Sequence, residues 1–312
     1  MKERREYFLA EKGDEGPVSQ FLRRKAGLTP HQIRSAKFRP QGICVNGAQA
    51  RVTAEIKAGD CVSILLEKLE DPAGAQSDRY PQKEVLDILY EDEDLLIVNK
   101  PAGVAMHPAH GHFGDTLTDM AAEHFRAKGE ERQIRSVGRL DKDTSGIVVF
   151  AKNKIAAARL SGKSRGSFAG GCEKEYLAVC EGHLKEDGRG LSVHLSMRRA
   201  PGELNRMEVC PAGEGMEAHT YIEKIRECGE NDLLRVRITT GRTHQIRVHL
   251  AALGHPLAGD TVYGSAGPGE AADAGIRRAA LHCARVRFRH PLRGEIMELE
   301  APLPEDMRRL TE

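Results

Sequence analysis

Residues Gly138–Asn153 read GRLDKDTSGIVVFAKN, a polar loop that runs directly into an apolar stretch. The stretch from Gly146 to Ala151 has the length and β-branched content of a buried strand. In the loop, Asp141 lies two positions after Arg139, and a nearby positive charge keeps a carboxylate ionised. An ionised carboxylate on such a loop can act as a nucleophile or a base. The same residues equally fit a structural ion pair in a turn, so the loop alone leaves both interpretations open.

Strand patterns dominate the chain around this loop. Two strands are expected on either side of the acidic turn in EVLDILYEDEDLLIVNKP, the second ending before Pro101. Further strands are expected at Tyr176–Glu181, His219–Arg226, Leu233–Ile238 and Ala284–Phe288. Helical spacing is found at Asp115–Lys128, with an Asp cap, at Lys154–Ser161, and at Thr243–Leu253, where Thr243 is a candidate cap. This balance predicts an α+β fold with a mixed, largely antiparallel sheet.

A tyrosine follows the loop about thirty-five residues later, in Lys174-Glu175-Tyr176 at the start of a predicted strand. Tyrosines are common in strands, where the ring is often half-buried and the hydroxyl reaches water. An aromatic ring can also stack on a nucleobase, and its hydroxyl can help to move a proton. Tyr176 by itself does not distinguish these roles.

Arginine and histidine side chains gather in the stretch Thr240–Leu250, which reads TGRTHQIRVHL. Arg247 lies one turn beyond the candidate cap, and Arg242, His244 and His249 add further donors. The stretch also fits a surface helix or a phosphate site, and two histidines spaced His-x4-His are a poor zinc motif without a third ligand. We therefore expect no metal here. Leu281, within Arg278–His282, fits an ordinary buried strand residue.

Together these motifs resemble the RluA-type pseudouridine synthases, in the family's order and over about residues 85–302. The resemblance implies the pseudouridine synthase fold and an enzyme that isomerises uridine in RNA. It places the family's catalytic aspartate on Asp141, its paired arginine on Arg247 and its base-packing tyrosine on Tyr176. It also implies that Arg139 contacts or displaces bases around the target and that Leu281 packs beside the uracil. Arg242 and His244 are further substrate-binding candidates, and Gly138 stands where the family often has His.

The N-terminal region has an uneven charge distribution, although the whole chain has a net charge of only +1. No Asp or Glu occurs from Pro17 to Thr53, and apolar residues recur there at roughly helical spacing. A basic run is usually a solvated surface, but this periodicity favours an ordered pair of basic helices that could contact phosphates. The RNA-binding candidates are Arg23, Arg24, Lys25, Arg34, Lys37 and Arg39.

A short hairpin is expected after these helices, because Ile43-Cys44-Val45 leads into an Asn46-Gly47 turn. Two small helices followed by such a ribbon resemble the RNA-binding module of a small-subunit ribosomal protein, called the αL motif, over about residues 17–67. Residues 68–82 lack apolar periodicity and have the composition of a linker. The predicted organisation is a small basic RNA-binding domain at 1–70, a linker at 71–82 and a catalytic domain at 83–312.

Composition limits the remaining possibilities. Hydrophobic residues make up 40% of the chain, which is enough for a globular core. Seven scattered cysteines, without a Cys-x-x-Cys pair, argue against a disulfide scaffold, a zinc site and secretion. The apolar run near the N-terminus is too short for a signal peptide or a membrane span. We therefore expect a soluble, cytoplasmic protein that has no membrane partner.

The expected reaction needs no redox step, metal or cofactor, since uracil leaves the ribose through N1 and rejoins it through C5. The target must leave its stack, and Asp141 could then act at the ribose or at the uracil ring. By analogy, the N-terminal module favours large-subunit ribosomal RNA over transfer RNA as the partner, and a monomer is the simplest state. Two alternatives from other classes are an RNA-binding protein with a degenerate enzyme domain, and a metal-dependent hydrolase or phosphotransferase using Asp141 and Asp143.

Overall fold

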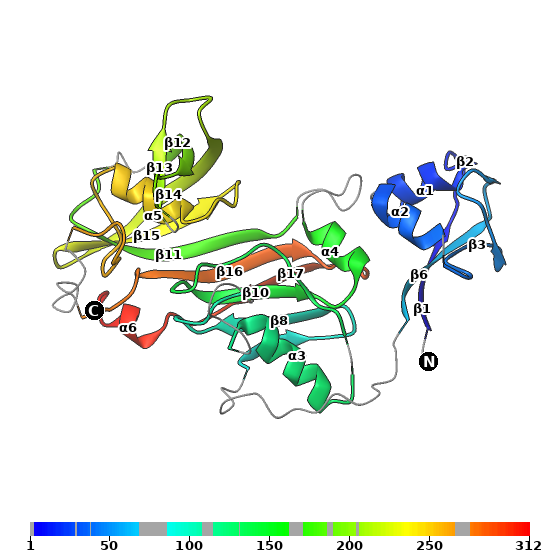
Figure 1. The fold of residues 1–312 in the computed structure, drawn as a ribbon, viewed down its shortest axis with the longest axis horizontal. Helices are drawn as coiled ribbons and strands as arrows, with labels where there is room; N and C mark the ends of the chain where they lie inside the picture. The colour runs from blue at the N-terminus through cyan, green and yellow to red at the C-terminus, as the bar shows by residue number, and fades with distance from the viewer. Residues whose placement is uncertain are drawn as a thin grey trace.

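The computed structural model describes residues 3–28, 30–37, 39–68, 86–107, 115–130, 132–161, 171–185, 190–203, 206–265 and 275–312. The linker expected at 71–82 lies outside the described residues. The described part contains a small N-terminal sheet with two helices and a large sheet with four helices around it (Figure 1).

The N-terminal unit, residues 3–68, has a four-stranded sheet in the order β1-β6-β3-β4. Its elements are β1 (Glu3–Leu9), β2 (Gly16–Pro17), α1 (Val18–Arg24), α2 (Pro30–Lys37), β3 (Ile43–Val45), β4 (Ala48–Gln49), β5 (Glu55–Ile56) and β6 (Cys61–Lys68). Asn46 and Gly47 have φ angles of 50° and 83°, as a type I′ hairpin turn requires. The predicted hairpin and helix pair are therefore present. The pairing of β1 with β6 was not anticipated.

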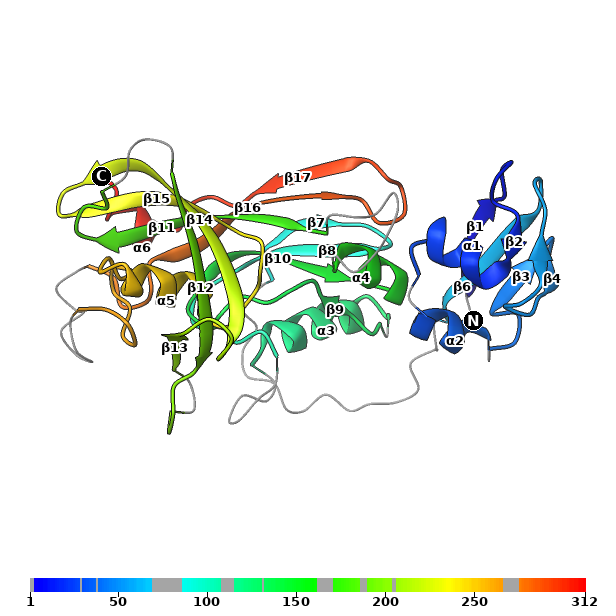
Figure 2. The same cartoon turned by 90° about the horizontal axis from the view of Figure 1, so that it is seen from above.

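The large sheet has eleven strands, nine of which follow the order β13-β12-β14-β15-β11-β16-β10-β8-β7. The strands are β7 (Ile88–Glu91), β8 (Leu95–Lys100), β9 (Arg135–Ser136), β10 (Ser145–Ala151), β11 (Glu173–Glu181), β12 (Leu191–Arg199), β13 (Met207–Cys210), β14 (Met216–Cys228), β15 (Asn231–Ile238), β16 (Leu281–Arg289) and β17 (Ile296–Glu300). β17 pairs with β16, and β9 pairs with β10. Figure 2 shows β12 and β13 extending away from the plane of the central strands.

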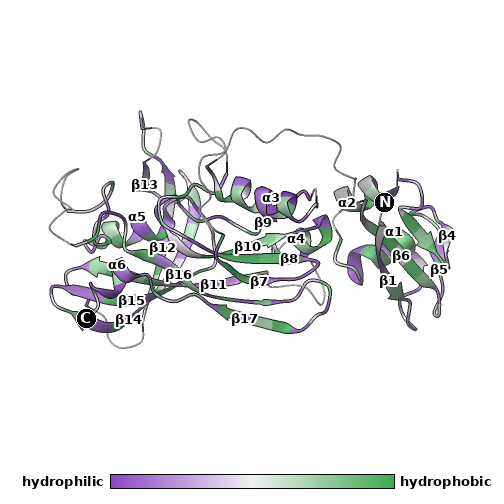
Figure 3. Cartoon of the chain, turned by 90° about the horizontal axis from the view of Figure 1, so that it is seen from below, coloured by the Kyte–Doolittle hydropathy of each residue, from purple (hydrophilic) through white to green (hydrophobic). Residues whose placement is uncertain are grey.

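The sheet is mixed because β10 and β16 run parallel, whereas the other strand pairs in its described part are antiparallel. Every residue of β10 is buried, and four of the six residues of β8 are apolar and buried. Figure 3 accordingly colours β8 and β10 as hydrophobic. These observations confirm the predicted α+β fold with a largely antiparallel sheet. The polar loop 138–144 precedes β10 and is therefore held at the end of the central strands.

Four helices accompany the large sheet: α3 (Leu117–Ala127), α4 (Lys154–Leu160), α5 (Gln245–Ala252) and α6 (Glu305–Arg308). Two predicted caps are wrong. The Thr116 side chain, one residue after Asp115, accepts from the Asp119 backbone N–H and forms a capping box. His244, with φ 55°, takes the N-cap position of α5 in place of Thr243, and it makes no side-chain cap.

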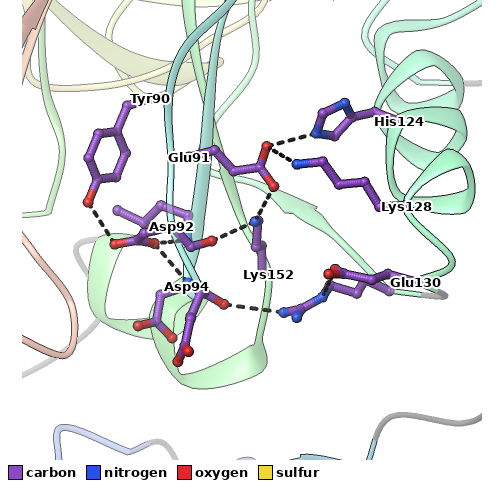
Figure 4. A network of polar contacts seen from close by, with 11 residues as sticks. Tyr90, Glu91, Asp92, Asp94, His124, Lys128, Glu130 and Lys152 are labelled. Atoms are coloured by element: carbon purple, nitrogen blue, oxygen red, sulfur yellow. Dashed lines mark hydrogen bonds and ion pairs between the residues drawn. The ribbon is translucent and has the colours of Figure 1, made fainter.

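A polar network fixes the acidic turn between β7 and β8 (Figure 4). Glu91 receives hydrogen bonds from His124 of α3, from Lys128 just after α3 and from Lys152 after β10, at 2.7, 2.8 and 2.7 Å. Burial alone would raise the Glu91 pKa, but these three donors outweigh it and lower the pKa to about 2. The carboxylate thus stays ionised and ties α3 to the sheet.

Candidate active site

A cavity of about 340 Å³ lies where the loop 138–144 meets β11, α4 and α5. Sequence segments that are far apart converge on it. Of the predicted site residues, the lining includes Arg139, Asp141, Tyr176, Arg242, Arg247 and Leu281. The end of α4 contributes Leu160 and Ser161 to the same wall. One cavity therefore collects residues from five regions of the sequence.

Backbone contacts hold the loop that carries Asp141. Gly138 has a φ of 73°, a left-handed backbone conformation that residues other than glycine adopt only at a cost in free energy. Lys100 is fully buried and donates to the carbonyls of Pro101, Val104 and Lys142 at 2.8–2.9 Å. These three carbonyls accept all the hydrogens of an ammonium group, while burial lowers the Lys100 pKa to about 7. The loop is therefore anchored one residue beyond Asp141.

Arg247 is positioned by a second carboxylate that sequence reasoning missed. Its Nε and Nη2 donate to Asp260 Oδ2 and Oδ1, each at 2.7 Å, which is a bidentate pair. Its remaining nitrogen, Nη1, lies 4.0 Å from Asp141 Oδ2. The guanidinium thus faces Asp141 but is hydrogen-bonded to Asp260. Asp260 lies in the stretch GHPLAGDTVYG, residues 254–264, where no local sequence pattern singles out its carboxylate.

The electrostatics of this pair favour full ionisation. Burial alone would raise the Asp260 pKa, but Arg247 and the N–H groups of Val262 and Tyr263 lower it below its ordinary value. Burial alone would likewise lower the Arg247 pKa, but the bonds to Asp260 raise it. The Arg247 guanidinium also lies 5.1 Å from the centre of the Tyr263 ring. Arg247 therefore presents a fixed positive charge to Asp141.

Tyr176 and Leu281, on the neighbouring strands β11 and β16, contribute to the apolar lining of the cavity. Their exposed fractions are 4% and 3%. Burial, and then the nearby thiol of Cys283 and carboxylate of Asp141, raises the Tyr176 pKa well above its ordinary value. The phenol consequently keeps its proton at neutral pH, next to the carboxylate.

The other predicted substrate-binding residues differ in how they are placed. Arg139 is exposed at the rim of the cavity. Arg242 lines the cavity and donates through Nε to the Glu217 carbonyl at 3.0 Å. His244 does not line the cavity, and its Nδ1 lies 2.9 Å from the Tyr263 hydroxyl. His244 therefore contacts Tyr263, the ring that the Arg247 guanidinium also approaches.

The basic residues of the N-terminal unit lie on or just after α1 and α2. Arg23, Arg24, Arg34 and Lys37 are exposed, and Arg39 is partly exposed. Lys25 is instead engaged in ion pairs with Glu11 at 2.6 Å and Asp14 at 3.1 Å. These acids precede the acid-free stretch, so a search along that stretch alone did not reveal them. Lys25 therefore already has two carboxylate partners, which reduces the charge that it offers to a phosphate.

Two groups of side chains in the described ranges have metal-ligand spacing, and both are distant in sequence from Asp141 and Asp143. In Asp92, Asp94 and His290, the oxygens of Asp92 already accept from Tyr90, His290 and two backbone N–H groups. In His183, Glu227 and Asp232, the Asp232 carboxylate already accepts from His183 and the Leu184 N–H. Both groups are explained by these internal hydrogen bonds. Within the described part of the chain, no helix is long and apolar enough to span a membrane.

Comparison with known proteins defines the class. The family model for RNA pseudouridylate synthase matches residues 94–252, so the chain belongs to this family. It is an RNA pseudouridine synthase of the RluA type, an isomerase that acts on RNA. Membership in this family rules out the alternative function considered from the sequence, a metal-dependent hydrolase or phosphotransferase.

The chain is similar to several relatives over most of its length. It is 37% identical over 86% of its length to the uncharacterized RNA pseudouridine synthase YhcT of Bacillus subtilis, of which it covers 84%. It is 35% identical over 85% of its length to ribosomal large subunit pseudouridine synthase D of Nitrosomonas europaea, of which it covers 74%. Human RNA Pseudouridylate Synthase Domain Containing 1 superposes with a TM-score of 0.52 and 27% identity, over 71% of this chain and 86% of that one.

Proposed function

We propose that this enzyme converts uridine to pseudouridine in large-subunit ribosomal RNA, with Asp141 as the nucleophile. The observation that carries the proposal is the shared cavity, in which Asp141 lies 4.0 Å from Arg247 and shares the lining with Tyr176 and Leu281. Support for the RNA class comes from relatives named ribosomal large subunit pseudouridine synthase D.

The chemistry requires a carboxylate that stays ionised next to the target. The bond between uracil N1 and ribose C1′ breaks, the base turns, and a new bond joins C5 to C1′. C5 then loses its hydrogen and N1 gains one, so the product is an isomer of the substrate. Asp141 can act at C1′ or at the uracil ring, and in both routes Arg247 keeps it charged and oriented.

The remaining lining residues would hold the extruded base. Removing a base from its stack costs a few kcal/mol, which contacts in the cavity must offset. Tyr176 and Leu281 offer apolar faces to the uracil, while Arg139 at the rim can fill the gap in the RNA or contact flanking phosphates. Arg242 would contact the substrate backbone, and His244 would hold the Tyr263 hydroxyl.

The N-terminal unit would bind RNA outside the cavity. Its exposed arginines and lysines on α1 and α2 suit phosphates, whose contacts dominate affinity for nucleic acids. We assign residues 1–70 to this RNA-binding domain, 71–82 to a linker and 83–312 to the catalytic domain. We further propose that the enzyme acts as a monomer in the cytoplasm.

A map of pseudouridines in total RNA, from cells with and without the gene, tests the proposal. The expected result is the loss of one or a few pseudouridines from large-subunit ribosomal RNA, restored by the wild-type gene. Losses confined to transfer RNA would refute the choice of substrate. Identical maps would favour a protein that only binds or remodels RNA.

A further inference from the structure

Helix α4 contacts both the N-terminal unit and the catalytic cavity. Ile155, on its first turn, is 4% exposed and belongs to the hydrophobic core that also contains Phe21 and Leu22 of α1. Leu160 and Ser161, at its end, line the cavity. Figures 1 and 2 both place α4 at the end of the large sheet nearest α1 and α2. A two-turn helix therefore joins the N-terminal unit to the cavity wall.

Arg159 provides the polar part of this junction. Its side chain is 1% exposed, and its Nε and Nη2 donate to the Ala26 carbonyl at 2.8 and 2.6 Å. Its Nη1 donates to Glu6 Oε1 at 2.8 Å and to the Pro291 carbonyl at 2.6 Å. The guanidinium also lies 5.7 Å from the centre of the Phe8 ring. Three of these four hydrogen bonds therefore reach the N-terminal unit.

A buried guanidinium is stable only when its donors are paired, so separation of the two units would leave Arg159 without most of its partners. Apolar contacts act in the same direction. Leu292 packs against the N-terminal core, as does Ile155, and both would become more exposed if the units separated. Domains of one chain usually move relative to each other unless their interface is large and hydrophobic. Here the cost of leaving the Arg159 guanidinium unpaired adds to that of exposing its apolar neighbours.

We propose that Arg159 is a positioning residue that determines which uridine is modified, by fixing the N-terminal unit against the wall of the catalytic cavity. This inference rests on the proposed function. A freely tethered RNA-binding domain raises the local concentration of every uridine within its reach. A docked domain instead favours a uridine at a set distance from the RNA segment held by α1 and α2. Arg159 and Leu160 are adjacent in sequence, so docking and cavity shape are directly connected.

The test uses the full chain with Arg159→Gln and, from the other side of the contact, Glu6→Gln. Arg309→Gln is the control, because that arginine is 71% exposed and, within the described residues, its ion pair is with Glu305, four positions away at the start of α6. The first readout is small-angle scattering, in which both interface variants should show a larger maximum dimension than the wild type and the control. If both interface variants give the same scattering curve as the wild type, Arg159 and Glu6 do not hold the two units together and the inference is overturned.

The second readout is the distribution of pseudouridines on an unmodified large-subunit ribosomal RNA transcript, together with kcat and KM on a short hairpin containing the preferred uridine. For Arg159→Gln we expect the preference for the main site over other uridines to fall about tenfold or more. The kcat on the hairpin should stay close to that of the wild type. An equal loss on both RNAs, with an unchanged site distribution, would mean that Arg159 only supports the cavity wall and would overturn the inference. If the wild type makes no pseudouridine in either RNA, the proposed function is wrong. The scattering measurement would still test the contact between the two units, because it does not depend on activity.

Discussion

Replacing Asp260 by Asn removes the charge that orients Arg247 while keeping the shape of the side chain. At an effective dielectric constant of about 20, unit charges about 4 Å apart attract each other by about 4 kcal/mol. Two effects offset part of the lost attraction. The variant no longer buries a charged carboxylate, and the amide oxygen of Asn can still accept one of the two hydrogen bonds from Arg247. We therefore expect the free energy of unfolding to fall by about 3 kcal/mol, the lower end for breaking a buried ion pair.

The catalytic rate should also fall. Without its 2.7 Å contacts to the Asp260 carboxylate, the Arg247 guanidinium is free to turn toward Asp141, whose Oδ2 lies 4.0 Å from Arg247 Nη1. A displacement of about 1 Å in a catalytic group typically costs about 100-fold in rate. The assay combines urea unfolding with single-turnover pseudouridine formation, both measured on Asp260→Asn. Because the Asp260 pKa is lowered in the folded protein, its contribution is present above the ordinary pKa of 3.8 and is lost as the pH falls below it. The stability difference from the wild type should shrink accordingly in acid.

Asp306→Asn is the matched control, because Asp306 also binds an arginine in bidentate fashion, Arg278 at 2.7 and 2.9 Å. The Asp306 side chain is 41% exposed and lies outside the catalytic cavity, so its loss should cost about 1 kcal/mol or less. Its rate should remain close to that of the wild type. If Asp260→Asn behaves like this control in both stability and rate, Asp260 does not position Arg247 and the reasoning is refuted.

Two further predictions concern Arg247 and the buried His282 of β16. Arg247→Lys should lower kcat by about 100-fold, because an ammonium group cannot bind Asp260 in bidentate fashion and still face Asp141; a near-normal kcat in steady-state assays would give Arg247 another role. Burial lowers the pKa of His282 in the folded protein to about 4. As the pH drops from 6.5 toward 4, the unfolded chain binds a proton at His282 while the folded protein does not, so the free energy of unfolding should fall. His282→Gln should flatten this dependence in urea titrations, and an unchanged slope would show that other groups cause it.

The central strands could be predicted because their sequence pattern is local. The run from Gly146 to Ala151 is apolar throughout, and in the structure it forms the buried strand β10. Asn46-Gly47 predicts a hairpin for an equally local reason, since both residues adopt positive φ at little cost. The pairing of β1 with β6, in contrast, joins residues about sixty positions apart, and only the folded chain shows it.

The site was only partly predictable for the same reason. Asp141, Tyr176 and Arg247 could be assigned from the resemblance to a family, and the structure places all three on one cavity. Asp260 was missed because its role depends on the approach of Arg247 from α5, which no local pattern reports. The ion pairs of Lys25 with Glu11 and Asp14 were missed because charge was followed along one stretch of sequence, whereas the partners meet in space.

The Asp141 carboxylate is proposed to perform the chemistry, and Asp141→Asn tests this role most directly. Pseudouridine formation should be measured under single-turnover conditions on a large-subunit ribosomal RNA transcript, with binding of the same RNA measured on the same preparation. We predict no detectable product and an RNA affinity close to that of the wild type, because the amide keeps the shape of the cavity but cannot act as a nucleophile. Product formation at a rate near that of the wild type would contradict the claim and remove Asp141 from its role.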